Sequence, residues 1–189
     1  MKTTITFLSL ALAFCVFSVA KPNKQKAKGK SGQRAEHLVT VTDDFIVDVY
    51  HNGVKVPDSK RKLALERFGA TVERITADVR KGDWLVFNVV NNRLRWGGAY
   101  YFAVAGVLAP NEYGFVSELE SGKWSVCDDP GQTMDFIRKK NFMSHNRAVQ
   151  VERPWHEGTK FMKQYAGKGW HGEPLWGRSR NTWIKVIVK

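Results

Sequence analysis

Cysteine is scarce in this chain, which has two among 189 residues. Cys15 lies in an N-terminal apolar stretch that we expect to be removed, so Cys127 is left alone and no disulfide within the chain is predicted. An exported domain without disulfides depends on its hydrophobic core, and a domain of roughly 150 residues buries about 70% of its unfolded surface, which is enough. No His and Asn pattern of a thiol enzyme flanks Cys127, so we expect it to be a small buried side chain.

Recognisable catalytic motifs are also missing. The five His show no HExxH pairing, and the sequence contains no GxSxG and no phosphate-binding loop. Glu112, Glu118 and Glu120 could supply the two carboxylates of a glycosidase, but any protein of this size has such residues. We therefore expect a protein that is not an enzyme and needs no cofactor, with glycoside hydrolysis as the open alternative. Without a DNA- or RNA-binding motif, nucleic acid is not an expected partner.

A second long apolar run is absent, and the one that exists lies at the N-terminus. Residues 1–20 have a basic start, an apolar stretch and small residues before a cleavage site after Ala20, which is the pattern of a signal peptide. A retained anchor is the alternative, although the run is short for a membrane span. The sequence predicts a secreted, periplasmic or cell-surface protein with no transmembrane segment after cleavage.

Large apolar residues are absent from residues 21–37, which carry six Lys or Arg and one Glu. Such a segment cannot pack, so it is predicted to be a basic, flexible linker or tail. It is either a solvated spacer or a region that adheres to anionic polymers through screened charge attraction. The formal net charge of +12 fits both.

Residues 38–189 contain short β-type runs separated by turn residues. Phe45, Val47 and Val49 recur at every second position and are predicted to share one side of a strand, and Asn52-Gly53 predicts a type I′ hairpin turn. Residues 84–90 are apolar on both faces, as in a central strand. Residues 134–142 and 159–166 are predicted to be short helices. The prediction is one all-β domain, an antiparallel jelly-roll-like β-sandwich.

Three segments support a resemblance to a known family. They are TVTDDFIVDVYHNGVKV (residues 40–56), ITADVRKGDWLVFNVVNN (75–92) and SGKWSVCDD (121–129). This pattern resembles galactose-binding-like jelly-roll domains, which accompany secreted glycoside hydrolases of the rhamnosidase type. The resemblance implies carbohydrate binding. After Asp129 the sequence departs from the pattern, with a basic and aromatic insertion and no hydrolase domain.

Two aromatic loops are the candidate ligand-binding sites. Trp offers a flat face for sugar C–H groups, and Arg, Asn and His supply hydrogen bonds. The alternative is that each Trp packs against the sandwich. Asp43 and Asp44 could ligate calcium, but without further oxygen ligands they are expected to cap a turn, and no metal site is predicted. The candidates are Asn91, Asn92, Arg93, Arg95 and Trp96 in the first loop and Trp170, His171 and Trp176 in the second.

The expected function is non-catalytic binding of a carbohydrate or anionic polysaccharide through these loops. The alternative is a structural or adhesion protein of the cell envelope whose basic tail binds polyanions. Exposed Trp rings beside polar groups would favour the first, and fully buried Trp rings would favour the second.

Overall fold

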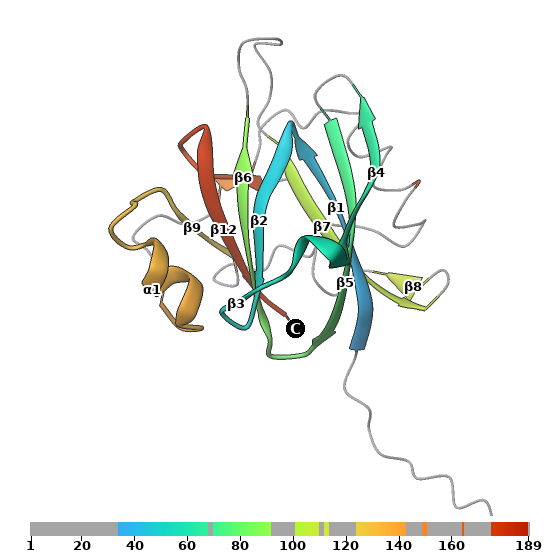
Figure 1. Ribbon diagram of the computed structural model, residues 1–189. Helices are drawn as coiled ribbons and strands as arrows, with labels where there is room; N and C mark the ends of the chain where they lie inside the picture. The colour runs from blue at the N-terminus through green and yellow to red at the C-terminus, as the bar shows by residue number, and fades with distance from the viewer. Residues whose placement is uncertain are drawn as a thin grey trace, which may run out of the picture. The chain divides into compact units, whose positions relative to one another are not determined.

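The computed structural model describes residues 34–67, 70–91, 101–109, 112–113, 124–142, 149–150, 164 and 175–188. All of them belong to one compact unit that spans Ser31–Lys189. The described residues form two antiparallel β-sheets packed face to face, with α1 (Thr133–Arg138) as the one α-helix bounded among them (Figure 1). The predicted all-β sandwich is confirmed.

The larger sheet, called sheet A, has the strand order β10-β11-β7-β1-β5-β4, with β8 paired to β7. Its central strand β1 pairs with β5 on one side and β7 on the other. Its strands are β1 (Arg34–Asp43), β4 (Arg61–Arg67), β5 (Ala70–Arg80), β7 (Phe102–Ala109), β8 (Glu112–Tyr113), β10 (Val149–Gln150) and β11 (Leu175–Trp176).

The smaller sheet, called sheet B, has the order β3-β2-β6-β12-β9. The segment that is apolar on both faces is β6, and it lies between β2 and β12 as a central strand, as predicted. Asn52 and Gly53 join β2 to β3 with φ values of 52° and 80°, which confirms the predicted tight turn. The strands of sheet B are β2 (Phe45–His51), β3 (Val54–Lys55), β6 (Trp84–Val90), β9 (Trp124–Cys127) and β12 (Asn181–Ile187).

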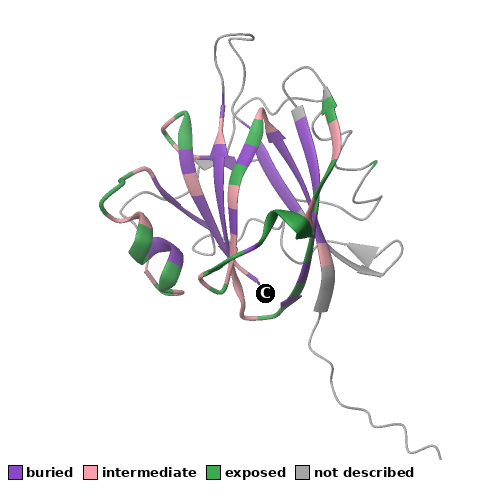
Figure 2. Ribbon diagram, viewed as in Figure 1, coloured by how far each residue is buried: buried purple, intermediate pink, exposed green. Residues whose placement is uncertain are grey.

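The core lies between the two sheets. Leu85 and Phe87 of β6 and Phe102 of β7 are fully buried there. The Phe87 and Phe102 rings, one from each sheet, lie 4.9 Å apart between centroids at an interplanar angle of 47°. The strands facing each other are buried along most of their length, whereas hairpins and one side of α1 are exposed (Figure 2). This core explains how the described sandwich can be stable without a disulfide.

The outer face of sheet B is covered in part by α1. Phe136 and Ile137 of the helix pack on Val86 and Cys127. Lys185 of β12 is fully buried under the helix, where its Nζ donates to the carbonyl oxygens of Lys139 and Phe142, both at 2.8 Å. The amine also lies 4.3 Å from the centroid of the Phe136 ring. Burial lowers the pKa of Lys185 to about 8.

Strand β2 departs from the predicted alternation. Ile46 and Val49 face the core, while Phe45 and Val47 are exposed, so the prediction that Phe45, Val47 and Val49 share one side is wrong. The cause is a β-bulge against β6, between the partners Ile46↔Val89 and Asp48↔Asn88. One extra residue shifts the two-residue period, which turns the side chains before the bulge to the opposite face.

Arg61 of β4 holds the bulge from the other sheet. It donates through Nη1 to the carbonyl oxygen of Val47 at 2.8 Å and through Nη2 to that of Ile46 at 2.6 Å. Glu73 of β5 accepts from Nε and Nη2 of Arg61, each at 2.9 Å. The side chains of Arg61 and Glu73 are 11% and 10% exposed, so this is a largely buried ion pair within sheet A, and the bonds from Arg61 to the two carbonyl oxygens of β2 join it to sheet B.

Other boundaries also differ from the predictions. β1 begins at Arg34, so the last four residues of the predicted linker, 34–37, belong to the sheet, where backbone pairing with β5 needs no apolar side chain. The helix predicted at 134–142 ends at Arg138, and β4 and the short 3-10 helix Asp58–Lys60 were not predicted. Residues 21–33 and, apart from residue 164, the predicted helix 159–166 lie outside the described residues.

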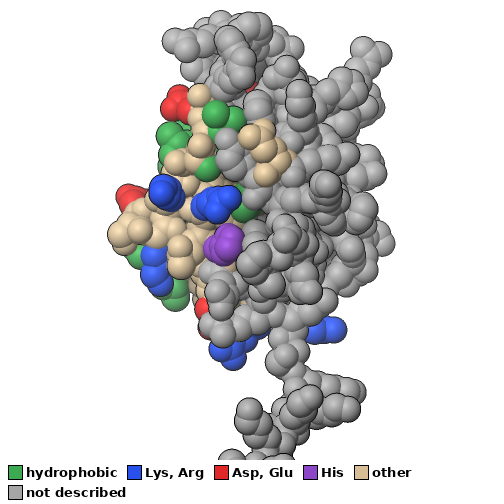
Figure 3. Space-filling model, turned by 90° about the vertical axis from the view of Figure 1, so that its right-hand side faces the viewer, with side chains coloured by type: hydrophobic (Ala, Val, Ile, Leu, Met, Phe, Trp, Pro, Cys, Tyr) green, Lys and Arg blue, Asp and Glu red, His purple; other side chains and the backbone are tan. Residues whose placement is uncertain are grey.

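On sheet A, the exposed side chains of β4 and β5 mix charge types (Figure 3). They include Lys62, Leu63, Arg74, Thr76, Asp78 and Arg80. Opposite charges lie close together in part, as in the exposed pair of Arg80 and Asp78 at 3.2 Å. In the part of the chain that the structure describes, no helix has the length and apolar character needed to cross a membrane.

Candidate functional site

The structure describes two of the eight candidate ligand-binding residues, Asn91 and Trp176. The other six, Asn92, Arg93, Arg95, Trp96, Trp170 and His171, lie outside the described residues, and their role stays a prediction. The structure therefore tests the first loop where it leaves β6 and the second loop near its end.

Trp176 is a core residue. It lies in β11, which pairs with β7 and β10, and its side chain is 1% exposed within the main core cluster. Its Nε1 donates to the carbonyl oxygen of Ser179 at 2.9 Å. The prediction of a loop at residues 175–176 is wrong, because these residues complete sheet A. Of the two roles left open for Trp176, packing is the one the structure shows, and the buried ring offers no face to a ligand.

Asn91 organises the end of β6. It is 3% exposed, and its Nδ2 donates to the carboxylate of Asp43, at the turn between β1 and β2. Its backbone N–H donates to the carbonyl oxygen of Arg180 at 2.8 Å, and its own carbonyl oxygen accepts from Nε of Arg180 at 3.3 Å. Asn91 thus joins three segments that are far apart in the sequence.

The two Asp residues at the β1–β2 turn have structural roles. Burial raises the pKa of Asp43 to about 6, with a further contribution from the nearby charge of Asp44, while the bond from Asn91 acts in the opposite direction. Asp44 has a positive φ of 64°, a conformation that Asp tolerates better than most residues. Among the described residues, no group of three His, Cys, Asp or Glu could hold a metal ion.

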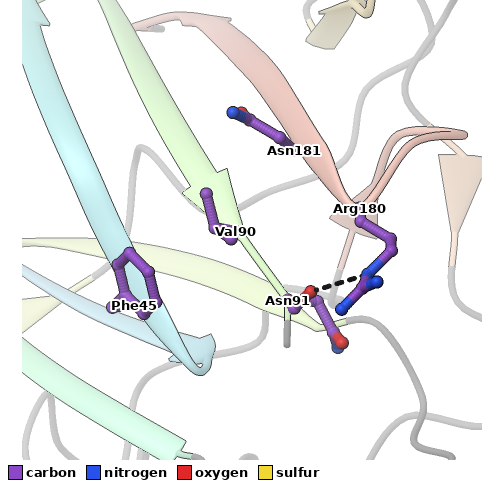
Figure 4. Close-up of a pocket in the computed structure, with 5 residues that line it drawn as sticks. All are labelled: Phe45, Val90, Asn91, Arg180 and Asn181. Atoms are coloured by element: carbon purple, nitrogen blue, oxygen red, sulfur yellow. Dashed lines mark hydrogen bonds between the residues drawn. The ribbon is translucent and has the colours of Figure 1, made fainter. Parts of the chain in front are cut away.

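A hollow of about 410 Å³ opens beside Asn91. Its walls come from the beginning of β2, the end of β6 and the beginning of β12, as Figure 4 shows. Phe45 is the β-sheet partner of Val90, and Val90 is the partner of Asn181. The pairing of the three strands therefore fixes which side chains meet there. The lining residues are Phe45, Val90, Asn91, Arg180 and Asn181.

Phe45 presents an aromatic ring to this hollow. The side chain is 47% exposed, and it faces outward because of the bulge that Arg61 holds. A ring with polar side chains nearby is suited to contact with a ligand that has both C–H and hydroxyl groups.

Arg180 and Asn181 supply polar groups beside the ring, and both are exposed. Nε of Arg180 is engaged with Asn91, which orients the guanidinium group at the rim (Figure 4). Among the described residues, neither Nη atom has a hydrogen-bond acceptor and no carboxylate pairs with this side chain. The hollow thus combines an apolar face with free donors.

The outer face of sheet B continues from the hollow toward α1. Its next row pairs Asp48, Asn88 and Trp183, and the Trp183 ring lies 6.0 Å from that of Tyr50. Asn88 is 6% exposed, and its Oδ1 has no hydrogen-bond partner within the described part of the chain. A buried acceptor without a partner lowers the stability of the folded state by about 1–3 kcal/mol. The row beside the hollow therefore contains an acceptor that could bind a donor from outside.

Two other reactive side chains that the structure describes, His51 and Cys127, have structural partners. Nε2 of His51 and Oδ2 of Asp83 are 2.8 Å apart, and Asn52 donates to Oδ1 of Asp83 at 2.9 Å, which ties the β2–β3 turn to the start of β6. Cys127 is buried, its Sγ donates to the carbonyl oxygen of Asp129 at 3.4 Å, and burial raises its pKa, which suits the expected inert thiol.

Sequence reasoning missed Phe45, Arg180 and Asn181 as members of the site. Arg180 and Asn181 precede the last apolar strand of the chain. Antiparallel pairing of that strand with residues 84–90 was the signal that could have placed them beside Asn91. No pattern in the sequence indicated the bulge that exposes Phe45.

No family model, curated protein or solved structure matches this chain.

Proposed function

We propose that this protein is an exported, non-catalytic carbohydrate-binding protein whose ligand occupies the hollow at the end of sheet B. One observation carries the proposal: the half-exposed ring of Phe45 lines the same hollow as the exposed amide of Asn181 and as Arg180, whose Nη donors have no acceptor among the described residues. This combination of an aromatic face and planar polar groups matches the two surfaces of a sugar.

The chemistry of a sugar explains why each part is needed. A pyranose has a face of C–H groups that packs on an aromatic ring, and an edge of hydroxyl groups that need hydrogen-bond partners. Asn181 can both donate and accept, while Arg180 only donates. The volume of about 410 Å³ lies within the roughly 300–1,000 Å³ usual for small-molecule sites.

The predicted first loop supports the same location. Asn91 lines the hollow, and residues 92–98 follow it directly in the chain. Trp96, Arg93 and Arg95, if they contribute as predicted, would extend a site that already has its base in β2, β6 and β12. The resemblance to galactose-binding-like domains points to the same class of ligand, although fold by itself does not fix function.

The second candidate is a structural or adhesion protein of the envelope. The burial of Trp176 favours it, because that ring packs in the core. The basic segment 21–37 provides the attraction to polyanions that this candidate requires. The two candidates differ in salt dependence, since contacts with an aromatic ring persist at high salt and charge adhesion does not.

A glycan array at low and high salt separates these candidates. The carbohydrate-binding proposal expects defined oligosaccharides to bind at both salt concentrations, and Phe45→Ala to lose that signal. Leu63→Ala is the matched control, because Leu63 is also an exposed large apolar side chain, 53% exposed, but it lies on β4 of the other sheet. Binding to every polyanion at low salt only, unaffected by Phe45→Ala, would instead support adhesion.

A further inference from the structure

We infer that the hollow selects acidic saccharides, with Arg180 as the residue that binds the carboxylate of a uronic acid unit. This inference rests on the proposed carbohydrate function and specifies its ligand class. Within the described residues, the fold orients the guanidinium group of Arg180 and leaves its Nη donors without an acceptor.

The fold fixes the direction of Arg180. Its backbone carbonyl accepts from the N–H of Asn91, and its Nε donates to the carbonyl oxygen of Asn91. These two contacts anchor both the backbone and the base of the guanidinium group at the rim. Preorganisation of this kind lowers the entropy lost when the group binds a ligand.

The outer edge of the guanidinium group is free to bind an anion. Across the residues that the structure describes, neither Nη of Arg180 has an acceptor, and no Asp or Glu forms an ion pair with it. Arg61, by contrast, is paired with Glu73 and two carbonyl groups. Two parallel N–H donors match the two oxygens of a carboxylate, which is why Arg recognises this group with bidentate geometry.

The arrangement of the lining places a carboxylate and a sugar ring together. Phe45, Val90 and Asn181 are partners across three adjacent strands. Two strand spacings are roughly 10 Å, a span that a disaccharide covers. A sugar unit that packs on Phe45 can therefore reach Asn181 with its hydroxyl groups while a neighbouring acidic unit reaches Arg180.

Two acidic groups near the hollow oppose an anionic ligand. Asp43 is bonded to Asn91, and Asp44 lies at the same turn. Burial raises the pKa of Asp43 to about 6, which reduces its negative charge in mildly acidic solution. The formal net charge of +12 acts in the other direction and favours the approach of acidic polymers.

The experiment compares tetragalacturonate with its fully methyl-esterified form, in which each charged carboxylate is replaced by a neutral methyl ester. Each is titrated by calorimetry into the wild-type protein, Arg180→Gln and Arg178→Gln. Arg178 is the matched control, because it is an exposed Arg two residues earlier that does not line the hollow. Thermal melts of the three proteins verify that they are equally folded.

We expect the wild-type protein to bind the acid more tightly than the ester. Arg180→Gln should weaken binding of the acid about ten-fold or more and change binding of the ester less than about two-fold. Arg178→Gln should leave both affinities near the wild-type values.

Equal loss of acid and ester binding in Arg180→Gln, or no loss of either, would overturn the inference while leaving a carbohydrate function that Phe45→Ala still abolishes. Absence of wild-type binding to both probes would also overturn it. In that case the neutral sugars of the array decide separately whether the broader proposal stands.

Discussion

Nε of Arg180 donates to the carbonyl oxygen of Asn91 at 3.3 Å, and the backbone N–H of Asn91 donates in return to the carbonyl oxygen of Arg180. This reciprocal contact joins the last residue described after β6 to the residue that precedes β12. It closes one wall of the hollow and orients a charged group at its rim. The site is therefore built by the pairing of two strands that are about half the chain apart.

Arg61→Ala should destabilise the protein and weaken ligand binding together. The substitution leaves Glu73 buried without its partner and removes both donors from the β2 bulge. Breaking a buried ion pair costs about 3 kcal/mol, which chemical denaturation measures. Arg80→Ala is the control: its pair with Asp78 is exposed and contributes less than about 1 kcal/mol. Unchanged stability and affinity in Arg61→Ala would show that the bulge does not need this residue.

Trp176→Ala should behave as a truncation in the core. The ring is almost fully buried between the sheets, so its removal leaves a cavity and costs about 3–5 kcal/mol. We expect the melting temperature to fall by about 10 °C while any affinity for sugar changes little. Calorimetric melts and titrations check the two effects. A stable variant with lost affinity would mean that Trp176 contacts the ligand.

Asp43→Asn should stabilise the protein at neutral pH. Burial raises the pKa of Asp43 from 3.8 to about 6, so the folded state binds a proton more tightly than the unfolded state. The stability that this provides is complete below pH 4 and is lost as the pH rises through 6. We expect the variant to melt about 2 °C above wild type at pH 7 and to equal it near pH 4. A difference that is the same at both pH values would contradict this account.

Lys185→Met should remove a contribution to stability that grows as the pH rises, in contrast to the contribution of Asp43, which shrinks. Burial lowers the pKa of Lys185 from 10.5 to about 8, so between these values the unfolded state binds the proton and the folded state does not. Wild-type stability should therefore rise relative to the variant as the pH increases from 8 to 10.5. The neutral amine can still donate to Lys139 and Phe142, so α1 stays attached. Thermal melts of both proteins across this pH range measure the effect. A difference in melting temperature that stays constant from pH 8 to 10.5 would contradict the account.

The features that follow from local chemistry could be predicted from the sequence. Asn52-Gly53 forms its turn because both residues tolerate positive φ. The alternation of Ile75, Ala77 and Val79 with polar residues matches their burial in β5. β6 is largely apolar on both sides because one side faces the core and the other packs against α1 at Val86.

The features that depend on distant contacts could not be predicted. The bulge in β2 is held by Arg61 of another sheet, and no local pattern reveals a partner so far away. Trp176 is surrounded by Gly and Pro in the sequence, which are typical of loops, yet pairing with β7 makes it a core residue. Arg180 lies at the hollow because of the register between β12 and β6, and a single sequence does not determine that register.

The central claim is that sugar binds at the hollow beside Phe45. The most direct measurement is a calorimetric titration of wild type, Phe45→Ala and Leu63→Ala with the oligosaccharide that gives the strongest signal on the array. The account predicts that Phe45→Ala weakens binding about five-fold or more, since an aromatic contact contributes about 1 kcal/mol or more, while Leu63→Ala binds as wild type does. Equal affinities for all three proteins, with Phe45→Ala as stable as wild type, would contradict the claim.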